Sequence, residues 1–336
     1  MPLGVGADSR PIVWDTQETN SLLVSGGPGT GKGAVLRNPI TEALRRGWQV
    51  VLLDPIKGGG DFKYAEPYCN VFAGTRVEAE AALKTLYAEV VRRKNLTSSY
   101  GVANFRDLPE NVRPTHILLV VDEFNNAIEE DKVDTRPSTD PEVEAARLEV
   151  VAENAAANAI GKTVGRIVKE ARSSGVSVLL AGQAIYAAQL AKAGASGLKA
   201  MMAAMLLGDP AYGAVQGALR SPDDAPDMGG VCPPGRGRYE STVASAVIIQ
   251  NLFATIDEHS RLLSGLPEVE KWDLAPKTRK LPSGPAVEDI MLGGPQTPQT
   301  VEFSLDDLLA LEGSGGSVVQ PAVQPVPFEQ QWQPTW

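Results

Sequence analysis

The chain has few cysteines and no long hydrophobic run. Its 336 residues include two cysteines, Cys69 and Cys232, too few for a disulfide framework or a cysteine-based metal site. No apolar stretch approaches the roughly 20 residues that a helix needs to cross a bilayer. The N-terminus also lacks the pattern of a secretory signal peptide. We therefore expect a soluble protein of the cytoplasm.

Basic residues do not outnumber acidic ones. Lys and Arg number 31 and Asp and Glu number 41, so the formal net charge is −10. This balance argues against a basic protein that simply coats nucleic acid. It leaves open a ring whose pore concentrates a few basic residues while its outer surface is acidic.

Apolar runs of strand length alternate with segments of helical pattern. Strands are predicted over 10–14, 21–25, 48–53, 71–73, 117–121, 176–183 and 242–252, and helices over 31–46, 78–94 and 141–173. Residues 200–207 fit a strand or a helix. This order predicts an α/β fold with a mostly parallel central sheet flanked by helices. Pro39 should kink or shorten the first helix.

The strand over 21–25 leads into a glycine-rich turn that a lysine and a helix follow. The turn consists of Gly26, Gly27, Pro28, Gly29, Thr30, Gly31, Lys32 and Gly33. Glycines let the backbone curl so that its N–H groups point at phosphate oxygens, and the helix adds the positive end of its dipole. Lys32 is then placed to reach the terminal phosphates. The turn therefore predicts a nucleotide-binding site.

One position of this turn departs from the pattern G-x-x-x-x-G-K-[ST]. Gly33 stands where a hydroxyl normally binds Mg²⁺. The metal is thereby left to Asp122, the nucleotide and water. Phosphate binding by the backbone should survive, whereas affinity for Mg²⁺·ATP or the rate of hydrolysis should fall.

Three further polar residues end buried strands. Asp122 and Glu123 follow the apolar run 117–121, and Gln183 ends the next strand. An aspartate there can hold Mg²⁺, and the glutamate after it can orient or deprotonate an attacking water. Gln183 lies at the carboxyl edge, where α/β sheets bind ligands, and is predicted to sense the γ-phosphate. ATP and Mg²⁺ are the expected cofactors.

Together these motifs resemble the FtsK/SpoIIIE family of DNA-pumping motors, within the FtsK/HerA superfamily of RecA-like P-loop ATPases. The resemblance also rests on Asp54-Pro55-Ile56-Lys57-Gly58, similar to the family's aspartate-proline-lysine motif with one extra residue, and on the arginine-containing segment 171–177. It implies a RecA-like motor that couples ATP hydrolysis to translocation of double-stranded DNA. A homohexameric ring is implied as well. The domain set resembles a minimal phage or mobile-element version, which would act in the host cytoplasm.

In such a ring an arginine of the neighbouring subunit stabilises charge on the transferring phosphoryl group. Arg172 matches the family's arginine, while Arg220, Arg236 and Arg238 are alternatives in segments predicted to be loops. Contacts with DNA phosphates are predicted for two lysines of a mobile glycine loop, Lys57 and Lys63. The alternative is that these two lysines only solvate a surface.

The composition changes near the C-terminal end. We predict a motor domain over 1–270, a linker over 271–303, a short acidic amphipathic helix over 304–312 and a disordered Pro/Gln-rich tail over 313–336. The aromatic end of the tail either anchors a partner protein or a neighbouring subunit, or is an ordinary disordered terminus.

Two other functions remain open. One is a secretion-type ATPase that moves protein with the same core. The other is a weakly hydrolysing, nucleotide-binding scaffold that recruits partners through its tail, as the glycine at position 33 allows.

Overall fold

The computed structural model describes residues 1–134, 136–183, 197–230 and 232–274. They belong to one compact unit, Met1–Lys277, and the second unit, Thr278–Trp336, lies outside the described residues. The predicted helix over 304–312 and the predicted tail over 313–336 therefore lie outside the described part as well. None of the described helices combines the length and the hydropathy of a membrane-spanning segment.

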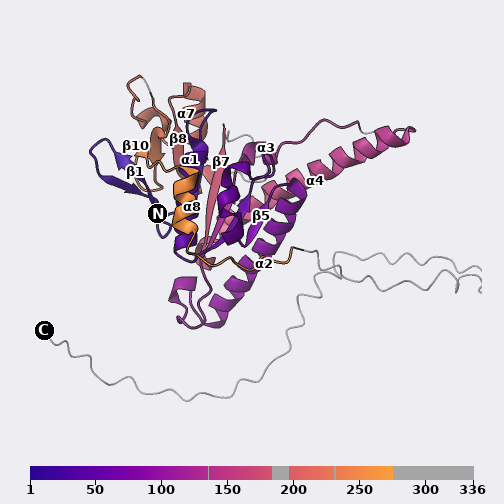
Figure 1. Cartoon of the computed structure of the whole chain (residues 1–336), viewed down its shortest axis with the longest axis horizontal. Coiled ribbons are helices and arrows are strands. Elements are labelled where there is room, and N and C mark those ends of the chain that lie inside the picture. Colours follow the sequence, from indigo (N-terminus) through magenta and orange to yellow (C-terminus); the bar gives the residue numbers. More distant parts are fainter. Residues whose placement is uncertain (135, 184–196, 231, 275–336) are drawn as a thin grey trace, which may run out of the picture. The chain divides into compact units, whose positions relative to one another are not determined.

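A ten-stranded sheet runs through the unit (Figure 1). Its parallel half consists of β3 (Ser21–Ser25), β4 (Gln49–Leu53), β5 (Val71–Ala73), β6 (Ile117–Val121), β7 (Val176–Gly182) and β8 (Ala203–Leu207). The order across this half is β8-β3-β7-β6-β4-β5. β3, β6, β7 and β8 are buried along their whole length, which explains their unbroken apolar sequences, since parallel strands are covered on both faces.

An antiparallel half extends the sheet beyond β8. It consists of β1 (Pro2–Gly6), β2 (Pro11–Val13), β9 (Arg236–Glu240) and β10 (Val247–Asn251), in the order β2-β1-β10-β9. Sequence analysis missed β9, because its sequence RGRYE carries no apolar run. Residues 200–207, which fit a strand or a helix by sequence, contain strand β8, and a short helical turn precedes this strand.

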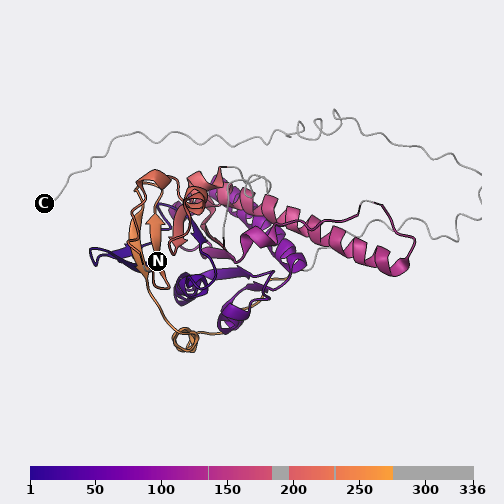
Figure 2. The ribbon, with the colours of Figure 1, turned by 90° about the horizontal axis from the view of Figure 1, so that it is seen from above.

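Helices cover the two faces of the sheet (Figures 1 and 2). They are α1 (Lys32–Arg45), α2 (Arg76–Ser99), α3 (Phe124–Ala127), α4 (Pro141–Glu170), α6 (Leu198–Met201), α7 (Tyr212–Ala218) and α8 (Ile256–Leu263). Short 3₁₀ helices are η1 (Gly60–Tyr68), η2 (Phe105–Asp107), η3 (Arg172–Ser174) and η4 (Pro222–Asp224). α1, α8 and η1 pack on one face, and α2 and α4 pack on the other. The alternating, mostly parallel α/β fold is confirmed.

Two helices differ from what the sequence predicts. α1 is not shortened at Pro39, which is buried within it beside Leu36 and Ile40. Packing of this apolar stripe on the sheet compensates for the missing backbone N–H. α2 begins at a capping box formed by Thr75 and Glu78 and runs past the predicted range.

α4 extends beyond the body of the unit (Figures 1 and 2). Asp140 caps its N-terminus, accepting hydrogen bonds from the backbone N–H groups of Glu142 and Val143. No residue is buried before Ala156, whereas the second half contributes residues such as Ile160 and Val164 to the core. Only this second half is needed to cover the sheet.

Candidate active site

The glycine-rich turn connects β3 to α1 at the carboxyl edge of the parallel strands. Gly29 and Gly31 adopt positive φ angles of 79° and 90°, which side chains other than glycine rarely tolerate. The Thr30 hydroxyl donates a hydrogen bond to the Gly27 carbonyl at 2.8 Å. The turn therefore has the curled backbone that the sequence predicts for phosphate binding.

The turn is also attached to the antiparallel half of the sheet. The Gly235 N–H, just before β9, donates to the Thr30 carbonyl at 2.8 Å. A Cβ on Gly31 would lie 3.0 Å from the Gly235 nitrogen, and one on Gly26 would lie 2.9 Å from the Leu207 Cβ. These close approaches require glycine on grounds of space.

Lys32 meets both predicted acidic residues. Its ammonium lies 3.1 Å from Asp122 Oδ1 and 2.7 Å from Glu123 Oε1. Asp122 and Glu123 are each 1% exposed, and Lys32 is 8% exposed. The structure thus brings together the residues predicted to handle phosphate, metal and water, although they are 90 residues apart in the chain.

Glu123 has an unusual backbone and a perturbed charge. Its φ of 48° is one of two positive values among the described non-glycine residues, and strain of this kind is concentrated at functional sites. Burial raises the pKa of its carboxyl, but hydrogen bonds from Lys32 and Lys57 outweigh burial and lower the pKa overall. Glu123 is therefore held ionised, as a general base must be.

Lys57 is the second cation of the site. Its ammonium lies 2.8 Å from Glu123 Oε1 and 3.8 Å from Asp122 Oδ2. Partial burial opposes its charged form, but the hydrogen bond to Glu123 and the neighbouring carboxylates outweigh burial and raise its pKa. The structure places this side chain on the acidic pair beside the phosphate loop. The predicted contact of Lys57 with DNA stays a prediction.

Asp54 holds the loop that carries Lys57. Its buried carboxylate, at the end of β4, accepts hydrogen bonds from the N–H groups of Lys57 at 3.1 Å and Gly59 at 3.0 Å. Burial, partly offset by these hydrogen bonds, raises the pKa of Asp54. The carboxylate therefore orders the loop.

Gln183 follows β7 and lies with these residues around one cavity. The cavity has a volume of about 530 Å³, within the range of small-molecule sites. Besides the phosphate loop it is lined by Ala34, Arg37, Lys57, Glu123 and Gln183. Gln183 is exposed, so its amide is accessible to a ligand.

The site fits a magnesium ion that arrives with a nucleotide. The buried oxygens Asp122 Oδ2 and Glu123 Oε2 accept no hydrogen bond, and carboxylate oxygens are ligands that Mg²⁺ prefers. The described residues contain no group of three or more His, Cys, Asp or Glu that could hold a metal. Mg²⁺ in such sites keeps water and phosphate ligands, so a small protein contribution suffices.

The predicted arginines lie away from this cavity or are already paired. Arg172, in η3, is exposed at the opposite end of β7 from Gln183, which a strand of this length puts about 20 Å away. Arg236 and Arg238 lie in β9, not in a loop. Arg238 pairs with Asp209 at 2.9 Å. Arg220 donates hydrogen bonds to the carbonyls of Ser241 and Thr242.

Lys63, the other predicted DNA contact, lies in η1. Its ammonium pairs with Glu66 at 2.8 Å and stands 5.3 Å from the centre of the Phe72 ring. Its side chain is 67% exposed. A contact with DNA through Lys63 stays a prediction.

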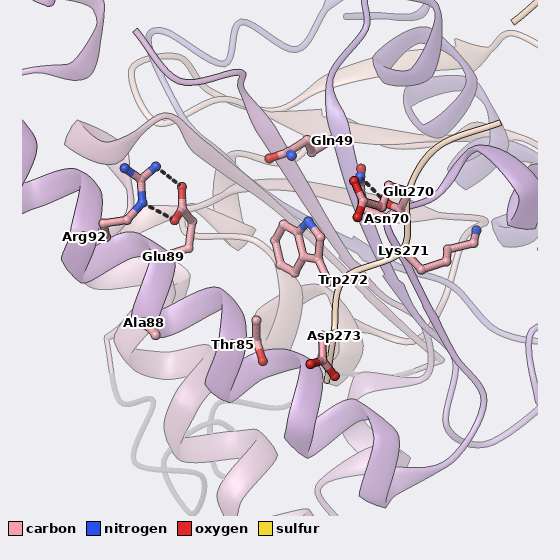
Figure 3. A pocket seen from close by; sticks show the side chains of 10 residues that line it. All are labelled: Gln49, Asn70, Thr85, Ala88, Glu89, Arg92, Glu270, Lys271, Trp272 and Asp273. Atoms are coloured by element: carbon pink, nitrogen blue, oxygen red, sulfur yellow. Dashed lines mark hydrogen bonds and ion pairs between the residues drawn. The ribbon is translucent and has the colours of Figure 1, made fainter. Parts of the chain in front are cut away.

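A larger cavity lies at the opposite edge of the sheet (Figure 3). It measures about 650 Å³ and is bounded by the starts of β4 and β5, by α2 and by residues 270–273. Trp272 points into it, and the Glu89–Arg92 ion pair closes one side. We assign the chemistry to the smaller cavity, because the glycine turn and the buried acids are there.

Two residues that the sequence motifs do not include, Arg37 and Asp61, lie close to the site. Arg37 lies one helical turn after Gly33, and this spacing was an available signal because such residues share a helix face. Asp61 lies in η1, and nothing in the local sequence brings it to α1. If Gly33 carried a Cβ, that atom would lie 3.7 Å from Arg37 Nη1 and 3.5 Å from Asp61 Oδ2.

Comparison with known proteins gives structural matches only. No family model matches the sequence, and no curated protein matches it. The pCW3 conjugation coupling protein TcpA, solved with ATPγS, is 18% identical with a TM-score of 0.63, covering 79% of this chain and 69% of TcpA. The cytoplasmic domain of the type VII secretion ATPase EccC from Thermomonospora curvata is 20% identical with a TM-score of 0.58.

That match covers 82% of this chain but 32% of EccC. ATPases 2 and 3 of EssC from Geobacillus thermodenitrificans are 13% identical with a TM-score of 0.55, covering 81% of this chain and 50% of EssC. The match thus spans about a third of the solved EccC chain and half of the solved EssC chain. As its motifs predict, the chain has an α/β fold that it shares with these ATPases.

Proposed function

We propose that this protein is an ATP-driven motor that assembles into a homohexameric ring and translocates double-stranded DNA. The observation that carries the proposal is the contact of Lys32 with both Asp122 and Glu123 at the mouth of the phosphate loop. A lysine, a metal-binding acid and a general base within hydrogen-bond distance are the parts that nucleotide hydrolysis needs. The likeness to ATPases supports this reaction.

Each residue has one role in the proposed mechanism. The backbone of residues 26–33 and the Lys32 ammonium bind the β- and γ-phosphates. Glu123 accepts a proton from the attacking water, and the Gln183 amide senses whether the γ-phosphate is present. Mg²⁺, when bound, neutralises phosphate charge, and Asp122 would hold it.

A nucleotide must also rearrange the cations. Lys32 is bonded to the acidic pair, so binding to phosphate replaces at least part of this contact. Lys57 remains to neutralise Glu123. Arg172 of a neighbouring subunit completes the site, because the distance along β7 prevents it from reaching its own phosphate loop.

Double-stranded DNA is the proposed cargo because TcpA, which has this fold, is a conjugation coupling protein, and conjugation transfers DNA. The likeness to EccC and EssC favours a second candidate, a motor that moves protein. ATP turnover with and without duplex DNA separates the two. DNA-stimulated turnover that Glu123→Gln abolishes supports the translocase, and turnover indifferent to DNA overturns it.

A native mass measurement tests the ring, with six copies expected in the presence of nucleotide. Tight ATP binding with no turnover under either condition would leave the nucleotide-dependent scaffold. This third candidate is retained because Gly33 lacks the hydroxyl that normally binds Mg²⁺, so hydrolysis could be weak.

A further inference from the structure

Asp61 occupies the space next to the missing hydroxyl of the phosphate loop. A Cβ built on Gly33 would lie 3.5 Å from Asp61 Oδ2 and 3.8 Å from Asp61 Cγ. A serine or threonine oxygen would extend one covalent bond from that Cβ. The Asp61 carboxylate is therefore the oxygen-bearing group that lies beside the place where the metal-binding hydroxyl normally stands.

The loop that brings Asp61 there is tightly fixed. Asp54 accepts hydrogen bonds from the N–H groups of Lys57 and Gly59. Gly59 has a φ of 77°, and a Cβ on it would overlap the Phe72 ring. Phe62, next to Asp61, is fully buried, and the Tyr64 hydroxyl donates to the Arg37 carbonyl of α1 at 3.4 Å. η1 is thus docked on the helix that begins at Lys32.

The Asp61 carboxylate itself has no fixed partner. Among the described residues it makes no hydrogen bond or ion pair, although its charge helps to raise the pKa of Lys57. Nearby, Asp122 Oδ2 is buried and accepts no hydrogen bond. Asp61 and Asp122 thus each offer a carboxylate oxygen that accepts no hydrogen bond, and oxygen is the ligand type that Mg²⁺ selects.

We propose that Asp61 replaces the missing hydroxyl, supplying an oxygen that, together with Asp122, binds the magnesium ion of Mg²⁺·ATP. The proposal rests on the proposed nucleotide function. Because no three-ligand group is present among the described residues, the metal should bind only together with nucleotide. A carboxylate also differs from a hydroxyl in its charge, so it repels phosphate when the metal is absent.

Mn²⁺ binding to the ADP-loaded full chain, measured by electron paramagnetic resonance, tests the proposal without relying on turnover. Asp61→Asn should weaken Mn²⁺ binding about tenfold or more, the range seen when metal-site groups are removed. The double variant Gly33→Ser with Asp61→Asn should recover most of the affinity, because serine restores the usual ligand. Glu66→Gln, the same charge change further along η1, is the matched control and should change nothing.

A second measurement has the opposite expected sign. With a chelator present, a fluorescent ADP analogue should bind Asp61→Asn more tightly than the unchanged chain, because a charge facing the phosphates has been removed. A change of less than twofold in Mn²⁺ affinity for Asp61→Asn overturns the proposal. A loss that serine at position 33 does not repair overturns it too, since Asp61 would then be structural. If the unchanged chain binds no ADP analogue, the proposed function itself fails.

Discussion

The ammonium of Lys57 and the carboxylate of Glu123 are 2.8 Å apart, so the proposed general base carries its own neutralising partner. Replacement Lys57→Met removes a hydrogen bond and a positive charge that lower the pKa of Glu123. The pKa of Glu123 then rises, and a larger fraction is protonated at a given pH. The acid limb of the pH profile of kcat should therefore move to higher pH.

The measurement is steady-state ATP turnover across the acid range. Lys63→Met is the control, and its pH profile should be unchanged. Lys63 lies in the adjoining 3₁₀ helix, and its ammonium pairs with Glu66. An acid limb that stays in place in Lys57→Met would show that Lys57 does not set the charge of the base.

Glu123→Gln should separate nucleotide binding from hydrolysis. The amide keeps the size of the side chain but cannot accept the proton of the attacking water. We expect turnover to fall by at least about 100-fold, the contribution typical of a general base, while a fluorescent ATP analogue still binds. Lys32→Ala, by contrast, should weaken binding itself. Residual turnover near the unchanged level in Glu123→Gln would assign the base to another group.

Asp54 should contribute to the stability of the fold through the two hydrogen bonds that it accepts. Asp54→Ala leaves the N–H groups of Lys57 and Gly59 without their acceptor, and each unsatisfied buried donor costs about 1–3 kcal/mol. Urea unfolding should show a loss of about 2 kcal/mol or more. Asp54→Asn, which keeps one acceptor oxygen, should lose less. Equal stability of the two variants would contradict this account.

The two histidines of the chain should make it less stable in mild acid. Burial, with nearby arginines, lowers the pKa of His116 to about 3, and burial also lowers the pKa of His259. Unfolded histidines take up a proton below about pH 6.5. His116 stays neutral in the folded chain over this range, and His259 takes up its proton at a lower pH when folded than when unfolded. The free energy of unfolding should therefore fall as the pH drops from 6.5 towards 5, by at most about 1.4 kcal/mol per unit for each histidine.

Urea unfolding at pH 7, 6 and 5 measures this slope. Because the chain has no other histidine, the variant with His116→Gln and His259→Gln should lose most of it. An unchanged slope in that variant would assign the acid sensitivity to carboxylates instead.

The proposed action of Arg172 on a neighbouring subunit can be tested by mixing two inactive variants. Arg172→Ala and Lys32→Ala should each lose turnover when assembled alone. In a mixed ring, some sites combine the intact phosphate loop of one variant with the intact arginine of the other, so turnover should reappear. If mixing restores nothing although mixed assemblies form, Arg172 does not act between subunits.

The parallel half of the fold could be predicted because its strands are continuous apolar runs ending in polar residues. Asp122, Glu123 and Gln183 all lie at the end of such a run, and parallel order brings these ends to one edge. β9 could not be found in this way, since Arg236 and Arg238 lie within it and leave no apolar run. One of its two neighbours in the sheet, β8, also comes from an earlier segment beyond α7.

The position of Lys57, the second cation of the site, also could not be predicted from sequence patterns. Lys57 lies in a glycine-rich loop, which suits a mobile contact as well as an ordered one. What orders it is the Asp54 carboxylate beneath the loop, and that depends on tertiary burial. Asp61 is similar, because its position near Gly33 results from the docking of η1 on α1.

The hydrogen bond from the Gly235 N–H to the Thr30 carbonyl links the phosphate loop to a segment that is distant in the sequence. The Gly235 amide can therefore report on the state of the loop. The exchange of that amide hydrogen with solvent depends on how often the bond opens. Phosphate bound in the loop restrains Thr30 and makes opening rarer. Deuterium uptake at Gly235 should therefore measure nucleotide occupancy in each subunit, independently of any chemical step.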